Sequence, residues 1–213
     1  MTWIKICGIT SPAAAVNVVE CGPSAIGLNF YPPSPRCVTP SVACSIRKSI
    51  ADGIEVIGVF VNESPEAIAV IADEVGLTGV QLHGDETPAD IVNLRQLVKT
   101  NVCKAFRIEQ CELQDATPDR ILVDARVKGV YGGSGERVDW SLVAVENRKW
   151  NCPPMILAGG LTAENVAEAI QTTSPWGVDV ASGVEDESGE KNVSLVKQFV
   201  HNAIQQNTPP TST

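Results

Sequence analysis

A lysine and a cysteine lie two residues apart near the start of the chain, as Lys5 and Cys7. If this segment is a strand, both side chains point to the same face, because side chains alternate along a strand. A cation beside a thiol favours the thiolate, which serves as a base or a nucleophile. A lysine that points inward is costly unless it faces a polar, solvent-filled space. The pair predicts acid–base chemistry at Cys7, with a buried structural cysteine as the alternative.

A carboxylate stands at the end of the apolar run Ile121–Val123, as Asp124. An unpaired buried charge is expensive, so a place in the core is hard to justify for this residue. A helix cap and a loop ion pair stay open as alternatives. If Asp124 lies across a shared cleft from Cys7, the two groups form a pair in which one donates a proton and the other removes one.

An arginine, Arg36, follows the proline-rich stretch Pro32–Pro35. A guanidinium group binds a carboxylate through two parallel hydrogen bonds. Prolines stiffen the loop and thereby reduce the entropy lost when the arginine is held in place. We therefore expect Arg36 to bind a carboxylate, with a solvated surface charge as the alternative.

Two short turns contain glycine and directly follow apolar runs, at 158–161 and 181–184. Glycine lets the backbone approach an anion closely, and backbone N–H groups in such turns bind phosphate. The residues that we expect at this phosphate site are Gly159, Gly160, Ser182 and Gly183.

Histidine is scarce, with His83 and His201 as its two occurrences. His83 follows an apolar run and is placed to face the same space as the other candidates, whereas His201 lies among apolar residues of a predicted helix. One such histidine is too few for a histidine-rich metal site, although Asp and Glu ligands stay possible. The sequence also lacks GxGxxG after its first strand and a GxSxG nucleophile motif. We expect neither a metal nor a dinucleotide cofactor.

Eight short apolar runs position these residues. The predicted strands are Trp3–Cys7, Ala25–Phe30, Glu55–Val61, Gly79–Leu82, Val102–Phe106, Ile121–Val123, Met155–Leu157 and Gly177–Val180. Most of the intervening segments have helical periodicity, and four have start signals, at Ser11-Pro12, Ser64-Pro65, Thr87-Pro88 and Thr162–Glu164.

Apolar strands that alternate with amphipathic helices indicate parallel strands joined by crossover helices. Eight such units in 213 residues predict a single-domain (β/α)8 TIM barrel with a parallel eight-stranded core, and a doubly wound sheet is the rival fold. In a barrel, chemistry belongs where strands end. Cys7 closes the first run, and His83, Arg107 and Asp124 directly follow the fourth, fifth and sixth runs. We expect one catalytic domain over residues 1–206 and a flexible tail over residues 207–213.

Composition excludes several classes of protein. A formal net charge of −9 without a run of basic residues argues against a nucleic-acid partner. Seven cysteines without a CxxC pair argue against a disulfide framework or a zinc ribbon. The start of the chain lacks the long apolar core of a signal peptide, and no window is apolar enough for a membrane span. We expect a reduced, cytoplasmic protein that binds a small phosphorylated molecule.

The motifs together resemble those of the phosphoribosylanthranilate isomerase family. They occur in order across nearly the whole chain and are highly specific as a set. The matching blocks are Lys5–Thr10, Gly27–Phe30, Ser34–Arg36, Gly58–Val61, Val80–Glu86, Gly132–Gly135, Asp139-Trp140, Ala158–Leu161 and Val178–Glu185.

The resemblance implies an Amadori rearrangement of N-(5′-phosphoribosyl)anthranilate in tryptophan biosynthesis, without a cofactor. It makes Asp124 the general acid at the ring oxygen and Cys7 the general base at C2′. Arg36 then holds the anthranilate carboxylate, and Gly159, Gly160, Ser182 and Gly183 hold the phosphate. The remaining residues that it places at the substrate are Lys5, His83, Arg107 and Asp179. A monomer or a homodimer is expected.

Two other functions remain to be separated from this one. One is another phosphate-binding barrel enzyme. A metal-dependent sugar-phosphate epimerase needs more acidic and histidine ligands at strand ends than the sequence places there, and indole-glycerol-phosphate synthase is expected to have further lysines at the mouth and an extension before the first strand. A non-catalytic binding or scaffold protein is the third possibility, and replacement of Cys7 separates it from an enzyme.

Overall fold

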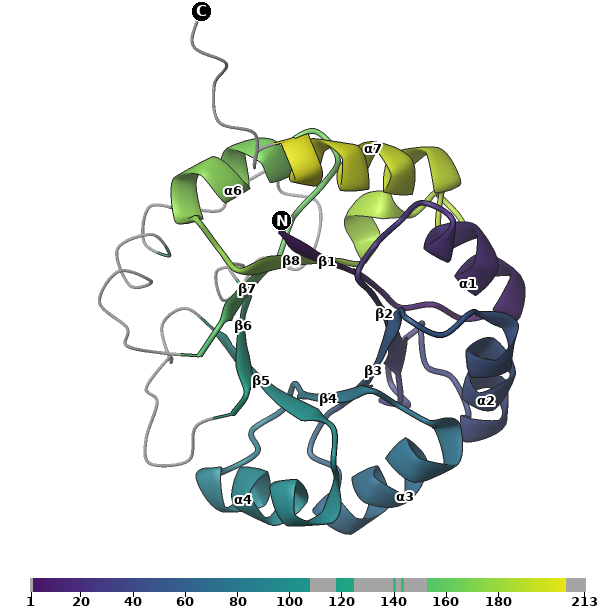
Figure 1. Cartoon of the computed structure of the whole chain (residues 1–213), viewed down its shortest axis with the longest axis vertical. Coiled ribbons are helices and arrows are strands. Elements are labelled where there is room, and N and C mark those ends of the chain that lie inside the picture. The colour runs from purple at the N-terminus through teal and green to yellow at the C-terminus, as the bar shows by residue number, and fades with distance from the viewer. Residues whose placement is uncertain (1, 108–117, 125–139, 141–142, 144–152, 206–213) are drawn as a thin grey trace, which may run out of the picture.

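The protein is a closed barrel of eight parallel strands in the order β1-β2-β3-β4-β5-β6-β7-β8, with helices around its outside (Figure 1). This computed structural model describes residues 2–107, 118–124, 140, 143 and 153–205. The strands are β1 (Trp3–Cys7), β2 (Ala25–Asn29), β3 (Glu55–Phe60), β4 (Gly79–Leu82), β5 (Asn101–Arg107), β6 (Arg120–Asp124), β7 (Met155–Ala158) and β8 (Gly177–Val180). The helices are α1 (Pro12–Val19), α2 (Pro40–Ser49), α3 (Pro65–Val75), α4 (Pro88–Leu97), α6 (Val166–Thr173) and α7 (Val193–Gln205), with a 3₁₀ turn η2 (Ser182–Val184).

Closure of the sheet comes from β1, which pairs with β2 on one side and β8 on the other. The (β/α)8 prediction is therefore confirmed, and the doubly wound alternative is excluded. Each predicted strand boundary agrees with the structure to within one residue. The predicted tail 207–213 lies outside the described residues.

Proline fixes the starts of four helices. Ser11, Ser64 and Thr87 each cap a helix whose first residue is proline, as predicted. Thr39 and Pro40 begin α2 in the same way, a start that the sequence analysis did not identify. The predicted start at Thr162–Glu164 is wrong, because α6 begins only at Val166.

The late start of α6 has a local cause. The side chain of Asn165 accepts a hydrogen bond from the Thr162 amide at 2.8 Å and donates one to the Gly160 carbonyl at 2.9 Å. These bonds hold the chain in a turn before the helix, and they do so directly beside the glycine turn that follows β7.

Alternation along the strands creates two apolar cores. One fills the space between the sheet and the helices, and the other fills the barrel itself. The inner core consists of Trp3, Ala25, Ile57, Cys103, Ala105, Leu122, Ile156 and Ala158. Burial raises the pKa of the Cys103 thiol to about 12, so this cysteine is an inert packing residue.

The amino-terminal end of the barrel is closed by an ion pair under two aromatic rings. Arg120 Nη1 donates to Glu55 Oε2 at 2.8 Å, and the guanidinium lies 4.6 Å from the ring centre of Trp176. Trp3 stacks on Trp176 and donates from its indole nitrogen to Glu55 Oε1 at 2.8 Å. These residues begin or precede their strands, so this end serves stability and leaves the opposite end for chemistry.

None of the helices among the described residues is long and apolar enough to cross a membrane.

Truncation of the inner core tests whether it is packed as described. Leu122 is fully buried within the barrel, and Leu122→Ala is expected to lower the free energy of unfolding by about 2–5 kcal/mol through lost contacts and a residual cavity. The matched control is Leu97→Ala on α4, where the side chain is 49% exposed and the expected loss is within about 0.5 kcal/mol. Urea denaturation measures both, and equal losses would contradict the assignment of Leu122 to the core.

Candidate active site

Lys5 lies inside the barrel with only 1% of its surface exposed. Its ammonium group donates to Asp179 Oδ1 at 3.0 Å and to Gln81 Oε1 at 2.9 Å. The strand register makes the ion pair possible, because Lys5 of β1 is directly opposite Asp179 of β8. The lysine therefore points inward, as the spacing of Lys5 and Cys7 predicts, but it is shielded from solvent. A carboxylate and an amide oxygen, rather than water, compensate its buried charge.

Cys7 ends β1 one layer above Lys5 and is partly exposed. Gly27 of β2 lies directly opposite it. A Cβ atom on Gly27 would lie 2.7 Å from Cys7 Sγ and 2.9 Å from Lys5 Cε, so glycine there makes room for both side chains. The thiol and the ammonium group consequently share one small space, as their spacing in the sequence predicts.

The pKa of Cys7 is set by competing effects. Burial raises it, Lys5 lowers it, Asp179 raises it and Lys191 lowers it, and the pKa ends above its ordinary value. Lys5 acts in the expected direction, but burial outweighs it. The raised pKa favours the neutral thiol, and a thiolate that forms from it is the stronger base.

His83 follows β4 and is connected to the buried lysine through Gln81. The side-chain nitrogen of Gln81 lies 2.8 Å from His83 Nδ1, while its oxygen accepts from Lys5. Burial lowers the pKa of His83, with Asp124 acting in the opposite direction, so the imidazole is neutral at pH 7. A polar chain thus runs from Asp179 through Lys5 and Gln81 to His83 across the top of the inner core.

Asp124 ends β6 at the same end of the barrel as Cys7. It is two residues beyond Leu122, whose side chain belongs to the inner core, so Asp124 is on the inward-facing side of the strand. In the register Asp124 pairs with Arg107 on one side and Ala158 on the other. The backbone of Arg107 ends β5, but its side chain lies outside what the structure describes.

The predicted phosphate site lies in the turns after β7 and β8. Gly159 and Gly160 have φ angles of 89° and 67°, a left-handed conformation that favours glycine. Gly183 contacts the Leu161 carbonyl so closely that a Cβ atom would overlap its oxygen. The two turns therefore pack against each other, with Gly160 and Ser182 exposed at the mouth.

Arg36 reaches toward the same mouth from the loop after β2. Gly8, at a φ of 83°, allows the Arg36 side chain to pass against the backbone. The loop is shaped by Ser34, whose hydroxyl accepts from the Arg36 amide at 3.1 Å and from Asn29 Nδ2 at 3.3 Å. The guanidinium group binds Glu185, a residue that the sequence analysis placed in a motif but gave no role.

A second buried ion pair supports the turn that follows β4. Lys104 Nζ donates to Glu86 Oε2 at 2.8 Å and to the Gly84 carbonyl at 2.6 Å, and Glu86 also accepts from the amides of Asn62 and Gly84. Neither this pair nor a role for Gln81 is among the predictions from the sequence. The spacing of Gln81 two residues before His83, which puts both side chains on one face, is the signal that points to Gln81.

The glycine-rich segment 132–135 lies outside the described residues. Within the part of the chain that the structure describes, no three histidine, cysteine or acidic side chains come together as a metal site.

The chain matches a family model over residues 4–202, described as N-(5′phosphoribosyl)anthranilate (PRA) isomerase. It is 39% identical over 207 residues to the N-(5′-phosphoribosyl)anthranilate isomerase of Trichlorobacter lovleyi, covering 95% of this chain and 98% of that relative.

Solved structures are similar over the whole barrel. One is phosphoribosyl anthranilate isomerase in complex with reduced 1-(o-carboxyphenylamino)-1-deoxyribulose 5-phosphate, with a TM-score of 0.81 and 34% identity. Another shows mutually generated monomers of the dimeric isomerase from Thermotoga maritima, with a TM-score of 0.80 and 34% identity. Each comparison covers 96% of this chain and 100% of the other.

Removal of one partner from the buried ion pair tests its contribution to stability. Lys5→Met leaves Asp179 without its cation, and Asp179→Asn leaves Lys5 without its anion, so each is expected to cost about 3–5 kcal/mol of unfolding free energy. The double variant has no buried charge to compensate and is expected to lose less than the sum of the single variants. Urea denaturation of all four proteins measures the coupling, and simple additivity would show that the two groups act independently.

Proposed function

The chain belongs to the N-(5′-phosphoribosyl)anthranilate isomerase family, and on that basis we propose how its residues carry out the reaction. The enzyme converts N-(5′-phosphoribosyl)anthranilate to 1-(2-carboxyphenylamino)-1-deoxyribulose 5-phosphate in tryptophan biosynthesis. This Amadori rearrangement opens a ribose ring and moves hydrogen from C2′. It therefore requires one group that donates a proton and one that accepts a proton, held on either side of the sugar.

Asp124 is the general acid and Cys7 the general base of this mechanism. Asp124 protonates the furanose ring oxygen, and the ring opens to a Schiff base. Cys7, as a thiolate, then removes the C2′ proton, and the enolamine that forms tautomerises to the ketone. The observation that carries the assignment is that both residues end strands at one end of the barrel.

Two lysines partly offset the cost of a buried thiolate at Cys7. Lys5 lies beneath the thiol and Lys191 acts on it from the loop after β8, and each lowers the free energy of the negative form. Burial acts against ionisation and makes the thiolate a stronger base. This suits the removal of a carbon-bound proton.

The two anionic ends of the substrate define two binding sites. Arg36 holds the anthranilate carboxylate, and backbone amides around Gly159, Gly160, Ser182 and Gly183 hold the phosphate. The related structure with a bound reduced product analogue supports a ligand that carries both groups. His83 and Asp179 adjoin the substrate from β4 and β8, and Arg107 is assigned to substrate binding by its place at the end of β5. Lys5 acts through the thiol rather than from the mouth surface.

The reaction proceeds without a cofactor in this proposal. The substrate nitrogen becomes an iminium group when the ring opens, and it accepts the electron pair released at C2′. The protein then supplies only placed proton carriers and charges.

We also place the enzyme in the cytoplasm, as a monomer or a homodimer. Five described cysteines are free thiols, which suits a reducing compartment. The Thermotoga maritima relative is described as dimeric, with monomeric forms also solved, so both states are compatible with this barrel.

Replacement of Cys7 tests whether the chain is an enzyme that uses this thiol. Cys7→Ser is expected to lower kcat by at least about 100-fold and leave KM within a few fold, because a hydroxyl is a poor base at neutral pH. Turnover is measured as the decrease in the fluorescence of the anthranilate group when the substrate is converted. A scaffold or binding protein predicts no turnover by the wild type and no effect of the substitution.

Replacement of Asp124 tests the acid separately. Asp124→Asn keeps the shape of the side chain but cannot donate a carboxylic-acid proton, so kcat is expected to fall by about 100- to 10,000-fold. Binding of the reduced product analogue, measured by calorimetry, is the control and is expected to persist. Near-normal kcat in this variant would remove Asp124 from the acid role.

A further inference from the structure

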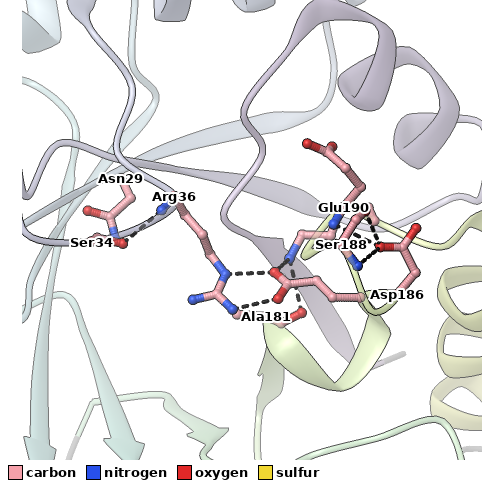
Figure 2. A network of polar contacts seen from close by, with 9 residues as sticks. Asn29, Ser34, Arg36, Ala181, Asp186, Ser188 and Glu190 are labelled. Atoms are coloured by element: carbon pink, nitrogen blue, oxygen red, sulfur yellow. Dashed lines mark hydrogen bonds and ion pairs between the residues drawn. The ribbon is translucent and has the colours of Figure 1, made fainter.

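A network of three charged side chains connects the loop after β2 to the loop after β8 (Figure 2). Arg36 donates from Nε to Glu185 Oε1 at 2.6 Å and from Nη2 to Glu185 Oε2 at 2.5 Å. Lys191 donates to Glu185 Oε1 at 2.5 Å and to the Ala181 carbonyl at 3.0 Å. Glu185 therefore accepts from two cations, one in the loop after β2 and one in the loop after β8.

We propose that Glu185 is the positioning residue of the carboxylate site, because it directs one edge of the Arg36 guanidinium toward the substrate and fixes that edge relative to the phosphate turn. The inference rests on the proposed function, in which Arg36 binds the anthranilate carboxylate. It adds a specificity-determining role for Glu185 and Lys191, to which the mechanism above gives no part in binding the carboxylate.

The geometry of arginine allows Arg36 to bind two carboxylates at once. A guanidinium group has two edges that can hold a carboxylate through paired bonds, one formed by Nε and Nη2 and the other by Nη1 and Nη2. Glu185 occupies the Nε edge. Among the described residues Nη1 has no acceptor, so the terminal edge of Arg36 stays available for a second carboxylate.

Burial and ion pairing keep Glu185 bound to Arg36 when a substrate carboxylate arrives. The Glu185 side chain is 6% exposed and that of Lys191 is 2% exposed, whereas 28% of the Arg36 side chain is exposed. Burial acts to raise the pKa of Glu185, but bonds from Arg36 and Lys191 outweigh it and bring the pKa below its ordinary value. Glu185 is thus a permanent anion that an incoming carboxylate does not readily replace.

The charge balance keeps the site attractive to an anion. Two cations and one carboxylate leave one net positive charge, and its most exposed part is the guanidinium group. A chain with a formal net charge of −9 thereby presents a local cation at the point where the substrate carboxylate arrives.

Lys191 connects the carboxylate site to the phosphate turn. Lys191 binds the Ala181 carbonyl, and Ala181 directly precedes the turn that contains Ser182 and Gly183. Glu185 and Lys191 also form an isolated antiparallel bridge in the backbone. The pair of Arg36 and Glu185 and the turn that contains Ser182 and Gly183 therefore belong to one rigid unit.

The loop between Glu185 and Lys191 is itself closed by local bonds. The Asp186 carboxylate accepts from the amides of Ser188 at 2.8 Å and Glu190 at 3.2 Å, which turns the chain back toward Lys191 (Figure 2). The spacing between the two anion sites then selects a ligand whose carboxylate and phosphate match that span.

The chain offers a matched control for a purely structural reading. Arg120 and Glu55 form another arginine–carboxylate pair with two bonds, at 2.8 Å and 3.3 Å, but at the amino-terminal end of the barrel. If Glu185 merely stabilises the fold, Glu185→Gln and Glu55→Gln will affect ligand binding alike. If Glu185 positions Arg36, only Glu185→Gln will change how the enzyme recognises a carboxylate.

The test measures the binding of two ligands by calorimetry. One is reduced 1-(o-carboxyphenylamino)-1-deoxyribulose 5-phosphate, and the other is the same molecule without its carboxylate. The wild type is expected to bind the first on the order of 100-fold more tightly, as for paired bonds to a charged group. The discrimination ratio is the Kd of the ligand without the carboxylate divided by the Kd of the ligand with it. In Glu185→Gln this ratio is expected to fall about tenfold, whereas Glu55→Gln is expected to keep the wild-type ratio. In turnover, Glu185→Gln is expected to raise KM and to change kcat little.

The direction of the change separates positioning from simple charge. Removal of a nearby negative charge, taken alone, strengthens the attraction for the substrate carboxylate, so a larger ratio in Glu185→Gln overturns the proposal. An unchanged ratio overturns it as well. A wild-type enzyme that binds the two ligands equally refutes the carboxylate role of Arg36, and the inference falls with it.

A second variant covers the case in which Glu185→Gln does not fold. Lys191→Met leaves the pair of Arg36 and Glu185 in place but removes their connection to Ala181. Its ratio is expected to fall less than in Glu185→Gln, and Lys191→Arg is expected to restore most of it because a guanidinium group can make both bonds. An unaltered ratio in Lys191→Met shows that the connection to the phosphate turn has no part in recognition.

Discussion

The buried bond between Lys5 and Asp179 is the interaction on which the candidate active site depends. An ammonium group within a barrel requires an anion, and the closure of β1 against β8 supplies one directly opposite. With the lysine fixed in this way, Gln81 orients its amide between Lys5 and His83, and the thiol of Cys7 lies immediately above a cation. The floor of the mouth is thus a set of charges with defined partners.

The upper part of the mouth also contains paired buried charges, but with a different charge balance. Lys5 has its charge matched by one carboxylate, whereas Glu185 has two cations and leaves one positive charge in excess. The first arrangement lies beneath the thiol of Cys7, and in our proposal the second attracts an anionic ligand. Local charge of this kind explains how an acidic protein can recognise a substrate that carries both a carboxylate and a phosphate.

Glycine makes both arrangements possible, because the site requires close approach as much as functional groups. Gly27 leaves space in which Cys7 and Lys5 meet, and Gly183 allows the turns after β7 and β8 to touch. Any larger residue at Gly183 would overlap the Leu161 carbonyl. Residues without side chains therefore define the dimensions of the mouth.

The sequence by itself determined the strands, the barrel and the identity of most candidate residues. Apolar runs, proline at helix starts and the position of Cys7 and Asp124 at the ends of their strands are local features, and such features persist in the folded protein. The start of α6 was misjudged because Asn165, three residues further on, competes for the same backbone groups.

Only the tertiary structure decided how the charges pair. Lys5 meets Asp179 across 174 residues of sequence, and Arg36 meets Glu185 across 149, so no local pattern connects them. The pKa of Cys7 also depends on the tertiary structure, because burial raises it by more than the neighbouring Lys5 lowers it. The sequence shows the lysine but not the burial. Electrostatic energy depends on distance and solvent exclusion, and both quantities exist only once the barrel has closed.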